Sequence, residues 1–249
     1  MKISIITATL NNVRDIKATI DSVLSQNYAD IEYIIVDGGS TDGSENIIAD
    51  AAAEHPDVIR AVTLPAKGVY NAINHGINLA TGDVIGLLHG NDRFTEVDIL
   101  TLVALAMKDV AIDVVFGDVY FVKPGTGKVV RRYSAHGFTR DRLLTLFAPP
   151  HPTLFVRREV YEKYGLYKED YVTAADFEYI ARILGKEKLN YKYIPVEMVE
   201  MTDGGMSTTF RHRLLTNPRE KARGLRENGM KFSLLGVIRR YFSLIFLRK

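Results

Sequence analysis

The fold is decided by the stretch Ile31-Glu32-Tyr33-Ile34-Ile35-Val36-Asp37-Gly38-Gly39-Ser40-Thr41-Asp42-Gly43. The run from Ile31 to Val36 is short and mostly apolar, which predicts a buried β-strand. The polar, glycine-rich residues after it predict a turn, and either Asp42 or Ser44 suits the N-cap of a helix through about Ala53. A strand, a turn and a helix in succession form the repeating unit of an α/β protein.

The same alternation extends to both sides of this stretch. We expect further buried strands over residues 3–8, 58–64, 83–88 and 113–117, with helices over residues 13–26, 71–80 and 96–107. Strand–helix alternation over the first 117 residues predicts right-handed crossovers and a mostly parallel central sheet flanked by helices. Ligands of such sheets bind beyond the carboxyl ends of the strands, so we expect the functional site there.

The second half of the chain has a different pattern. Residues 119–122 and 128–133 flank Pro124-Gly125-Thr126-Gly127 and predict a β-hairpin. Helices are expected over residues 158–164 and 175–184, and a strand over residues 191–194. Because the sequence has no repeat and no linker, we expect one domain over residues 1–210. Its halves cover about residues 1–117 and 118–210, and residues 211–249 form a basic helical extension.

Composition and motifs exclude several classes of protein. The chain has 249 residues, of which 47% are hydrophobic and 25% charged, as in ordinary globular proteins. It has no cysteine, which excludes disulfides, zinc–thiolate sites and iron–sulfur clusters. It also lacks the Gly-x-Ser-x-Gly and Walker motifs, which disfavours a serine hydrolase and a P-loop NTPase. The chain start lacks a signal-peptide core, and no apolar run approaches the ~18 residues of a membrane span, so we expect a cytoplasmic protein.

The charge is unevenly distributed along the chain. Residues 211–249 contain 11 Lys/Arg against 2 Asp/Glu, whereas the preceding residues carry a net charge of −7. Within residues 230–249, apolar side chains recur at helical spacing among basic ones. Because basic amphipathic segments bind anionic interfaces, we expect peripheral attachment to the inner face of the cytoplasmic membrane, and no nucleic-acid partner. The alternative is a helix that packs on the domain or on an oligomer partner.

Three aspartates could carry the chemistry, two of them at strand ends and Asp176 at the start of a helix, and each has two interpretations. Asp37 can hold a ribose or a base, with Gly38 allowing close approach, or it can cap the following turn. Asp92 can ligate Mg²⁺ or Mn²⁺ together with substrate phosphates, or it can cap a helix. Asp176 can act as a general base or as a helix cap, and Glu178 is the neighbouring alternative for the base.

The histidines receive little weight in this interpretation. His151 lies among three prolines in Pro149-Pro150-His151-Pro152, and a lone histidine is more often structural, so we assign it a minor role. The other histidines have no metal-ligand spacing, which makes a zinc site unexpected.

Taken together, the segments resemble the family 2 glycosyltransferases, which have the Rossmann-like GT-A fold and bind nucleotide sugars. The resemblance covers about residues 3–210, and it is closest to bacterial enzymes that build exopolysaccharide, capsule or O-antigen repeats. The matching pieces are Ser4-Ile5-Ile6-Thr7-Ala8-Thr9-Leu10-Asn11, Val36-Asp37-Gly38-Gly39-Ser40-Thr41-Asp42-Gly43, Lys67-Gly68-Val69-Tyr70-Asn71-Ala72, Ala80-Thr81-Gly82-Asp83, His89-Gly90-Asn91-Asp92, His151-Pro152-Thr153-Leu154-Phe155 and Ala174-Ala175-Asp176.

The resemblance implies a role for each of these segments. Asp37 would hold the uracil or ribose of the donor, Asp92 would contact the metal on the diphosphate, and Asp176 would be the catalytic base. The other donor-binding residues implied are Ala8, Thr9, Asn11, Gly38, Lys67, Asn71 and Asn91. Lys67 would add positive charge near the donor, although a solvated lysine is an equal alternative.

Two positions depart from the pattern of the resembling family. Asn71 stands where an aspartate is usual, and an amide can hydrogen-bond a donor but supplies no charge. The stretch ending in Asn91-Asp92 keeps one carboxylate where relatives often have two, although the diphosphate itself supplies metal ligands.

The implied activity is inverting transfer of a sugar from a nucleoside-diphosphate sugar to an acceptor hydroxyl. We expect a UDP-sugar, Mg²⁺ or Mn²⁺ as cofactor, and a lipid-linked or polysaccharide acceptor. A nucleotidyltransferase is disfavoured because residues 7–12 lack a glycine-rich basic loop. The remaining alternative is a non-catalytic module that binds a nucleotide sugar or a polysaccharide, which the amides at Asn71 and Asn91 motivate.

Overall fold

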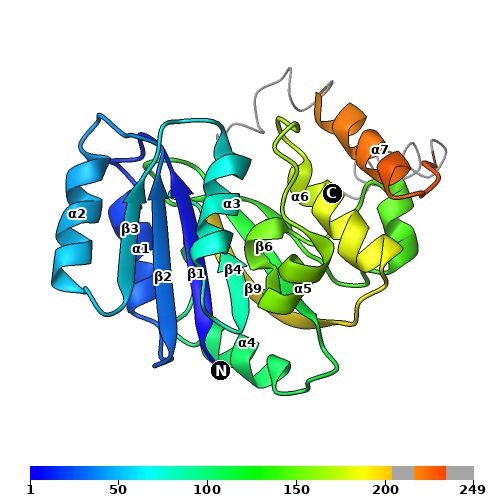
Figure 1. Ribbon diagram of the computed structural model, residues 1–249, viewed down its shortest axis with the longest axis horizontal. Coiled ribbons are helices and arrows are strands. Elements are labelled where there is room, and N and C mark those ends of the chain that lie inside the picture. The colour runs from blue at the N-terminus through cyan, green and yellow to red at the C-terminus, as the bar shows by residue number, and fades with distance from the viewer. Residues whose placement is uncertain (204–215, 234–249) are drawn as a thin grey trace.

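A central β-sheet with helices on both faces forms the protein in the computed structural model, which describes residues 1–203 and 216–233 (Figure 1). The strand order is β3-β2-β1-β4-β8-β6-β9-β5, and β7 pairs with β6. The strands of the described residues are β1 (Ile3–Thr9), β2 (Ile31–Asp37), β3 (Ile59–Thr63), β4 (Val84–Leu87), β5 (Asp92–Phe94), β6 (Val114–Val122), β7 (Val129–Tyr133), β8 (Phe155–Arg157) and β9 (Tyr191–Thr202).

The first four strands of the alternating pattern form a parallel sheet. β1 pairs in parallel with β2 on one side and with β4 on the other, and β3 extends the sheet next to β2. β8 is antiparallel to both β4 and β6, so β6 and its parallel neighbour β9 run in the same direction as β4. The prediction of an α/β fold with a mostly parallel central sheet is therefore confirmed.

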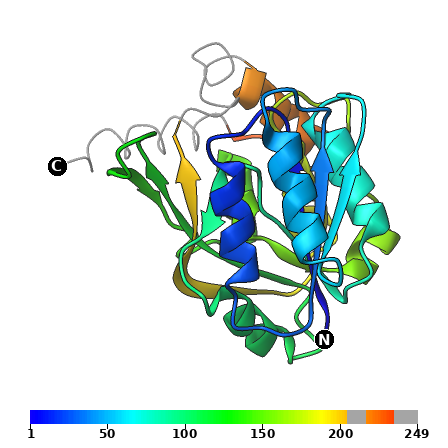
Figure 2. The same ribbon diagram turned by 90° about the vertical axis from the view of Figure 1, so that its left-hand side faces the viewer.

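The helices divide between the two faces of the sheet. α1 (Ile16–Leu24), α2 (Ser44–Glu54) and α4 (Ile99–Met107) pack on one face, and α3 (Val69–Leu79), α5 (Arg158–Tyr164) and α6 (Ala175–Ile180) pack on the other. Figure 2 shows α1 and α2 side by side on their face, with the β6–β7 hairpin extending to one side. This layering follows from strands whose alternate apolar side chains are buried on both faces.

The second half of the chain departs from the predicted elements in several places. β9 is longer than the predicted strand over residues 191–194, and its pairing with β6 shifts register around Pro195, where a proline is tolerated. β5 and β8 were not predicted, because runs of three residues carry no periodic signal. The helix expected over residues 175–184 is α6 followed by a π-helical segment, η3 (Ala181–Lys186).

Three further elements complete the described part of the chain, and the two 3₁₀ segments among them were not predicted. The two 3₁₀ segments are η1 (Arg140–Thr145) and η2 (His151–Thr153), and α7 (Asn217–Glu227) lies within the predicted extension. Most of residues 230–249, to which we assigned membrane attachment, lie outside the described residues.

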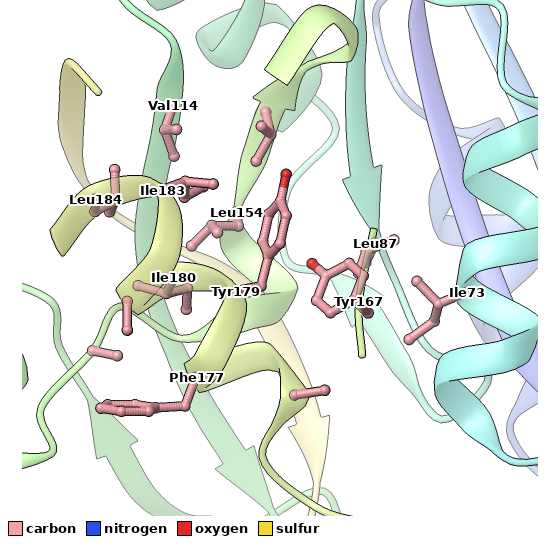
Figure 3. Packing of buried hydrophobic residues seen from close by; sticks show 14 of the residues in the cluster. Ile73, Leu87, Val114, Leu154, Tyr167, Phe177, Tyr179, Ile180, Ile183 and Leu184 are labelled. Carbon is pink, nitrogen blue, oxygen red and sulfur yellow. The ribbon is translucent and has the colours of Figure 1, made fainter. Parts of the chain in front are cut away.

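A tyrosine cluster joins α3 to α6 across one face of the sheet. The Tyr167 ring lies between Ile73 of α3 and Tyr179 of α6 (Figure 3), and the Tyr167 and Tyr179 ring centroids are 4.7 Å apart. Tyr161 stacks on Tyr179 with its centroid at 5.0 Å. All these rings are buried, so this cluster fixes α6 relative to the parallel half of the sheet.

A close approach in the sheet generates a stability prediction. A Cβ at Gly86 of β4 would lie 2.5 Å from Cε1 of Phe155, the residue paired with it on β8. Gly86→Ala should therefore lower the free energy of unfolding by about 1–3 kcal/mol, as overpacking does. Urea unfolding of Gly86→Ala, Phe155→Leu and the double variant measures it. The free energy of unfolding of the double variant should fall by less than the sum of the two single decreases. Strictly additive decreases would contradict the close contact.

Candidate active site

The carboxyl ends of β1 and β2 meet at one edge of the sheet. Thr9 is the register partner of Asp37, and the Gly38 amide donates to the Thr9 carbonyl oxygen at 2.9 Å. A Cβ at Gly90 would lie 2.3 Å from Oγ1 of Thr9, so the glycine lets the segment after β4 approach the end of β1. Thr9 and the adjoining buried Ala8 therefore lie between the Asp37 turn and the segment that leads to Asp92.

Asp37 is buried and organises the turn that follows β2. Its Oδ2 accepts from the Ser40 amide at 2.9 Å, and its Oδ1 accepts from the Ser40 hydroxyl at 2.5 Å. Asn11, at φ 53°, connects the loop after β1 to this turn. Its main-chain N–H donates to Ser40 Oγ, and its side-chain Oδ1 accepts from the main-chain N–H of Thr41. These hydrogen bonds agree with the interpretation of Asp37 as a cap of the turn. The carboxylate also lies beside the glycines of that turn.

Asp92 is a buried carboxylate at the start of β5. It is 1% exposed, and neither of its oxygens has a hydrogen-bond partner among the described residues. Burial raises the pKa of Asp92 to about 7. An unpartnered buried carboxylate is costly, and a bound cation is one way to compensate it. Residues 1–203 and 216–233 hold no cluster of three His, Cys, Asp or Glu that could bind a metal.

Two histidines connect Asp176 to the end of β4. Nδ1 of His151 lies 3.2 Å from Oδ2 of Asp176, and Nε2 of His151 lies 3.0 Å from Nε2 of His89. Burial first, and then the neighbouring His151, lower the pKa of His89 to about 3. His151 also acts electrostatically on Asp92. The series Asp176–His151–His89 therefore reaches from α6 toward the Asp92 segment.

Asp176 is the second residue of α6, and its side chain is partly exposed. Its Oδ1 is buried and has no partner within the part of the chain that the structure describes. Burial alone would raise the pKa of Asp176, but the hydrogen bond and charge interaction with His151, together with Lys221, lower it below the ordinary value. The Ala175 amide next to it donates to the Tyr70 hydroxyl of α3 at 3.2 Å. Asp176 is thus held ionised, and its buried Oδ1 has no hydrogen-bond partner among the described residues.

Glu178 occupies a different environment from Asp176. It is fully buried, and its carboxylate lies 3.2 Å from Nζ of Lys168 and 2.9 Å from an Arg182 nitrogen. The Asn228 amide donates to it at 3.1 Å. Both carboxylate oxygens are occupied by these groups, so the geometry gives Glu178 a structural role between α6 and the residues after α7.

The remaining predicted donor-binding residues lie around these groups. The Asn71 amide donates at 2.9 Å to Glu169, whose other oxygen accepts from Asn74. Lys67 is exposed, and its charge acts on Glu169. Asn91 lines a small pocket next to Asp92. The structure therefore brings Lys67 and Asn71 beside Glu169, a residue that the sequence interpretation did not include.

His89, His151 and Glu169 were missed as members of the site. His151 and His89 are 62 residues apart, and Glu169 is 98 residues from Asn71, so no local pattern connects them. The available signal was position: His89 follows an expected strand, and His151 lies in one of the segments that carry the resemblance.

Residues 4–165 match the model of Glycosyl transferase family 2. The chain belongs to this family. It is 33% identical over 211 residues to a PGL/p-HBAD biosynthesis glycosyltransferase of Mycobacterium bovis, an alignment that covers 83% of this chain and 79% of the relative. It is 31% identical over 172 residues to an uncharacterized glycosyltransferase of Nostoc, covering 66% of this chain and 53% of that relative.

Solved structures share the fold of this family 2 glycosyltransferase. S. aureus TarS 1–349 in complex with UDP-GlcNAc has a TM-score of 0.70 at 18% identity, covering 92% of this chain and 65% of that one. Mannosyltransferase PcManGT from Pyrobaculum calidifontis, in complex with GDP-Man and Mn²⁺, has a TM-score of 0.66 at 16% identity, covering 91% and 63%. The chain thus spans less than two thirds of either structure. The protein is a glycosyltransferase with the GT-A fold, as the resemblance implied. In the described part of the chain, no helix combines the length and apolarity that a membrane span requires.

The environment of Asp92 predicts a pH-dependent effect on stability. Its pKa is about 7 in the folded protein and about 3.9 when unfolded, so folding takes up a proton between these values. The wild type should therefore lose stability as the pH rises from about 4 to 7, and Asp92→Asn should not suffer this loss. At pH 8 with a chelator, Asp92→Asn should be more stable by about 1–4 kcal/mol, with a smaller difference at pH 5.

Urea unfolding at both pH values measures this difference. Mn²⁺ added at pH 8 should stabilise the wild type more than Asp92→Asn. A wild type that is the more stable protein at pH 8 in chelator would contradict the unpartnered state of Asp92.

Proposed function

We propose that the protein is an inverting, metal-dependent glycosyltransferase that moves a sugar from a nucleoside-diphosphate sugar, with UDP favoured, to an acceptor hydroxyl. The acceptor is a lipid-linked or polysaccharide chain in bacterial surface polysaccharide synthesis. The observation that carries the proposal is Asp176, a partly exposed, ionised carboxylate whose Oδ1 has no hydrogen-bond partner among the described residues and which is joined through His151 and His89 toward Asp92. A carboxylate in this state is suited to accept a proton.

The donor site in this proposal lies at the carboxyl ends of β1, β2 and β4. Asp37 contacts the base or ribose, with Ala8, Thr9, Asn11 and Gly38 around it, in the crevice where open α/β sheets bind their ligands. Asn91 lies toward the diphosphate, and Lys67 and Asn71 lie toward the sugar. The complexes of TarS with UDP-GlcNAc and of PcManGT with GDP-Man support a nucleotide-sugar donor.

The residues present fit a divalent cation held by Asp92. Two buried, unpartnered carboxylate oxygens are hard ligands, and Mg²⁺ and Mn²⁺ typically bind one or two carboxylates together with substrate phosphates. The Mn²⁺ in the PcManGT structure supports the same choice. When bound, such a cation stabilises negative charge on the departing diphosphate.

The chemistry of this chain's own residues is a single displacement. Asp176 Oδ1 accepts the proton of the acceptor hydroxyl while that oxygen bonds to the anomeric carbon. The bond from this carbon to the diphosphate oxygen breaks on the opposite face, so the sugar's configuration inverts and the nucleoside diphosphate leaves. His151 donates to the other oxygen of Asp176, which orients the carboxylate and keeps it ionised.

The organisation of the chain belongs to the same proposal. Residues 1–117 form the nucleotide-sugar half and residues 118–210 the acceptor half of the domain. Residues 230–249 attach the enzyme peripherally to the inner face of the cytoplasmic membrane, where a lipid-linked acceptor is available; the support is their basic, amphipathic sequence.

Thermal unfolding with a panel of UDP, GDP and dTDP sugars, with and without Mn²⁺, tests the proposed donor site. A ligand that binds the folded state raises the Tm according to its affinity. We expect one nucleotide class to raise the Tm, more so with Mn²⁺, and the shift to disappear in Asp37→Ala. Asp176→Asn should keep the Tm shift but release nucleoside diphosphate at least about 100-fold more slowly. Normal turnover in Asp176→Asn would reject this base, and binding without turnover in the wild type across an acceptor panel would favour a binding module.

The role of His151 is tested by two substitutions at the same position. His151→Ala removes the donor to Asp176 and should lower kcat by about 10- to 100-fold. In His151→Asn the amide nitrogen can occupy nearly the position of Nδ1, so kcat should fall by less than about fivefold. KM for the donor should change little in either variant. Equal losses in both variants would contradict orientation of Asp176 through Nδ1.

A further inference from the structure

α7 packs against the segment that leads into Asp176. Its inward-facing residues follow helical spacing, and α7 lies alongside α6 in Figure 1. Leu225 is fully buried, and a Cβ at Gly224 would lie 3.1 Å from Cβ of Glu178. The glycine therefore lets α7 come into close contact with α6, the helix that carries Asp176.

Glu220 of α7 binds the main chain just before α6. One of its carboxylate oxygens accepts from the Val172 amide at 2.7 Å, and the other accepts from the Thr173 amide at 2.8 Å and the Thr173 hydroxyl at 3.0 Å. Ala174, the next residue, is the N-cap of α6. A single side chain of α7 thus holds two consecutive amides within four residues of Asp176.

A second set of contacts fixes the preceding part of the same segment. Glu227 accepts from Lys168 Nζ at 2.8 Å and from the Tyr171 hydroxyl at 2.8 Å. Arg223 pairs with Asp170 and also donates to Glu227 at 2.6 Å. The segment from 168 to 173 is therefore connected to α7 by side chains from three successive turns of the helix.

The contacts of α7 are mainly polar, which distinguishes it from the other helices of the same face. Leu225 is its fully buried apolar side chain, whereas α3 and α6 each bury several. Charge-assisted hydrogen bonds are directional, so they fix orientation more strictly than apolar burial does. The contacts of α7 thus serve mainly to position the 168–173 segment, and they add little buried apolar surface to the core.

We propose that α7 is a positioning element of the active site, in which Glu220 holds residues 172–173 so that Asp176 meets His151. This inference rests on the proposed role of Asp176 as the base. The Asp176–His151 contact is 3.2 Å long, and displacements of about 1 Å at a reacting group can cost about 100-fold in rate. The Glu220 carboxylate is bonded to the main chain before α6, and it acts on Asp176 through that main chain.

The test uses the full-length protein and three variants. Glu220→Ala removes both acceptor oxygens, Glu220→Gln keeps one, and Arg226→Ala alters an exposed side chain of the same helix as a matched control. Release of nucleoside diphosphate is measured with UDP-glucose, UDP-N-acetylglucosamine and GDP-mannose in the presence of Mn²⁺, with water as acceptor. Amide hydrogen exchange of peptides covering residues 168–178 is measured in parallel, with peptides from β1 and β2 as the folding control.

We expect kcat to fall at least about tenfold in Glu220→Ala, with KM for the donor within about twofold of wild type. Exchange at residues 172–175 should accelerate while β1 and β2 stay protected. Glu220→Gln should regain most of kcat, and Arg226→Ala should match the wild type. A merely structural role would instead change kcat, KM and the exchange of β1 and β2 together.

Unchanged kcat in Glu220→Ala, with wild-type turnover present, would overturn the role of α7 and leave the proposed function intact. Unchanged exchange at residues 172–175 would overturn it as well. Absence of turnover in the wild type with all three donors, both with water and across the acceptor panel, would count against the proposed function, and this inference would fall with it.

Discussion

The parallel pairing of β1 with both β2 and β4 is the constraint on which the rest of the structure depends. It makes three apolar strands end at one edge of the sheet. The chain must turn after each strand, and its main-chain N–H and C=O groups need hydrogen-bond partners there. The turn after β2 does so internally, through Asp37, Ser40 and Asn11. The segment after β4 leaves Asp92 buried without a partner. The pairing therefore places both a rigid turn and an unpartnered carboxylate beyond the carboxyl ends of these strands.

Asp37, Asp92 and Asp176 show how environment separates residues of one type. Asp37 is satisfied by the hydroxyl and amide of its own turn. Burial raises the pKa of Asp92, whereas the hydrogen bond and charge interaction with His151 lower the pKa of Asp176, whose side chain is 26% exposed. These opposite shifts suit a cation ligand in one case and a proton acceptor in the other. The same logic separates Asp176 from Glu178, which is neutralised by Lys168 and Arg182.

The parallel half of the fold was predictable from the sequence because its signals are local. An apolar run, a glycine-rich turn and an amphipathic helix recur, and each lies within about 20 residues. The same signals located Asp37 at the end of β2 and Asp92 in the segment that follows β4. β9 was predicted too short because Pro195 interrupts its pattern, and the sheet tolerates that proline at a shift of register.

The contacts that give the site its chemistry were not predictable in the same way. In the sequence, His151 is a histidine among prolines. Its place in the site depends on its contacts with Asp176 and His89, which lie far from it in sequence. Asn71 looks like the loss of a charge, yet its amide faces the carboxylate of Glu169. The polar face of α7 resembles a solvated surface until its partners in the 168–173 segment are known. In each case the missing information is a long-range contact between side chains.

The most direct test of the central claim is a crystal structure with UDP and Mn²⁺, using the anomalous signal of manganese. The account predicts one manganese peak bonded to Asp92 and to diphosphate oxygens, with the nucleoside against Asp37 and Thr9. A nucleotide bound away from Asp37, or a manganese ion held without Asp92, would contradict it.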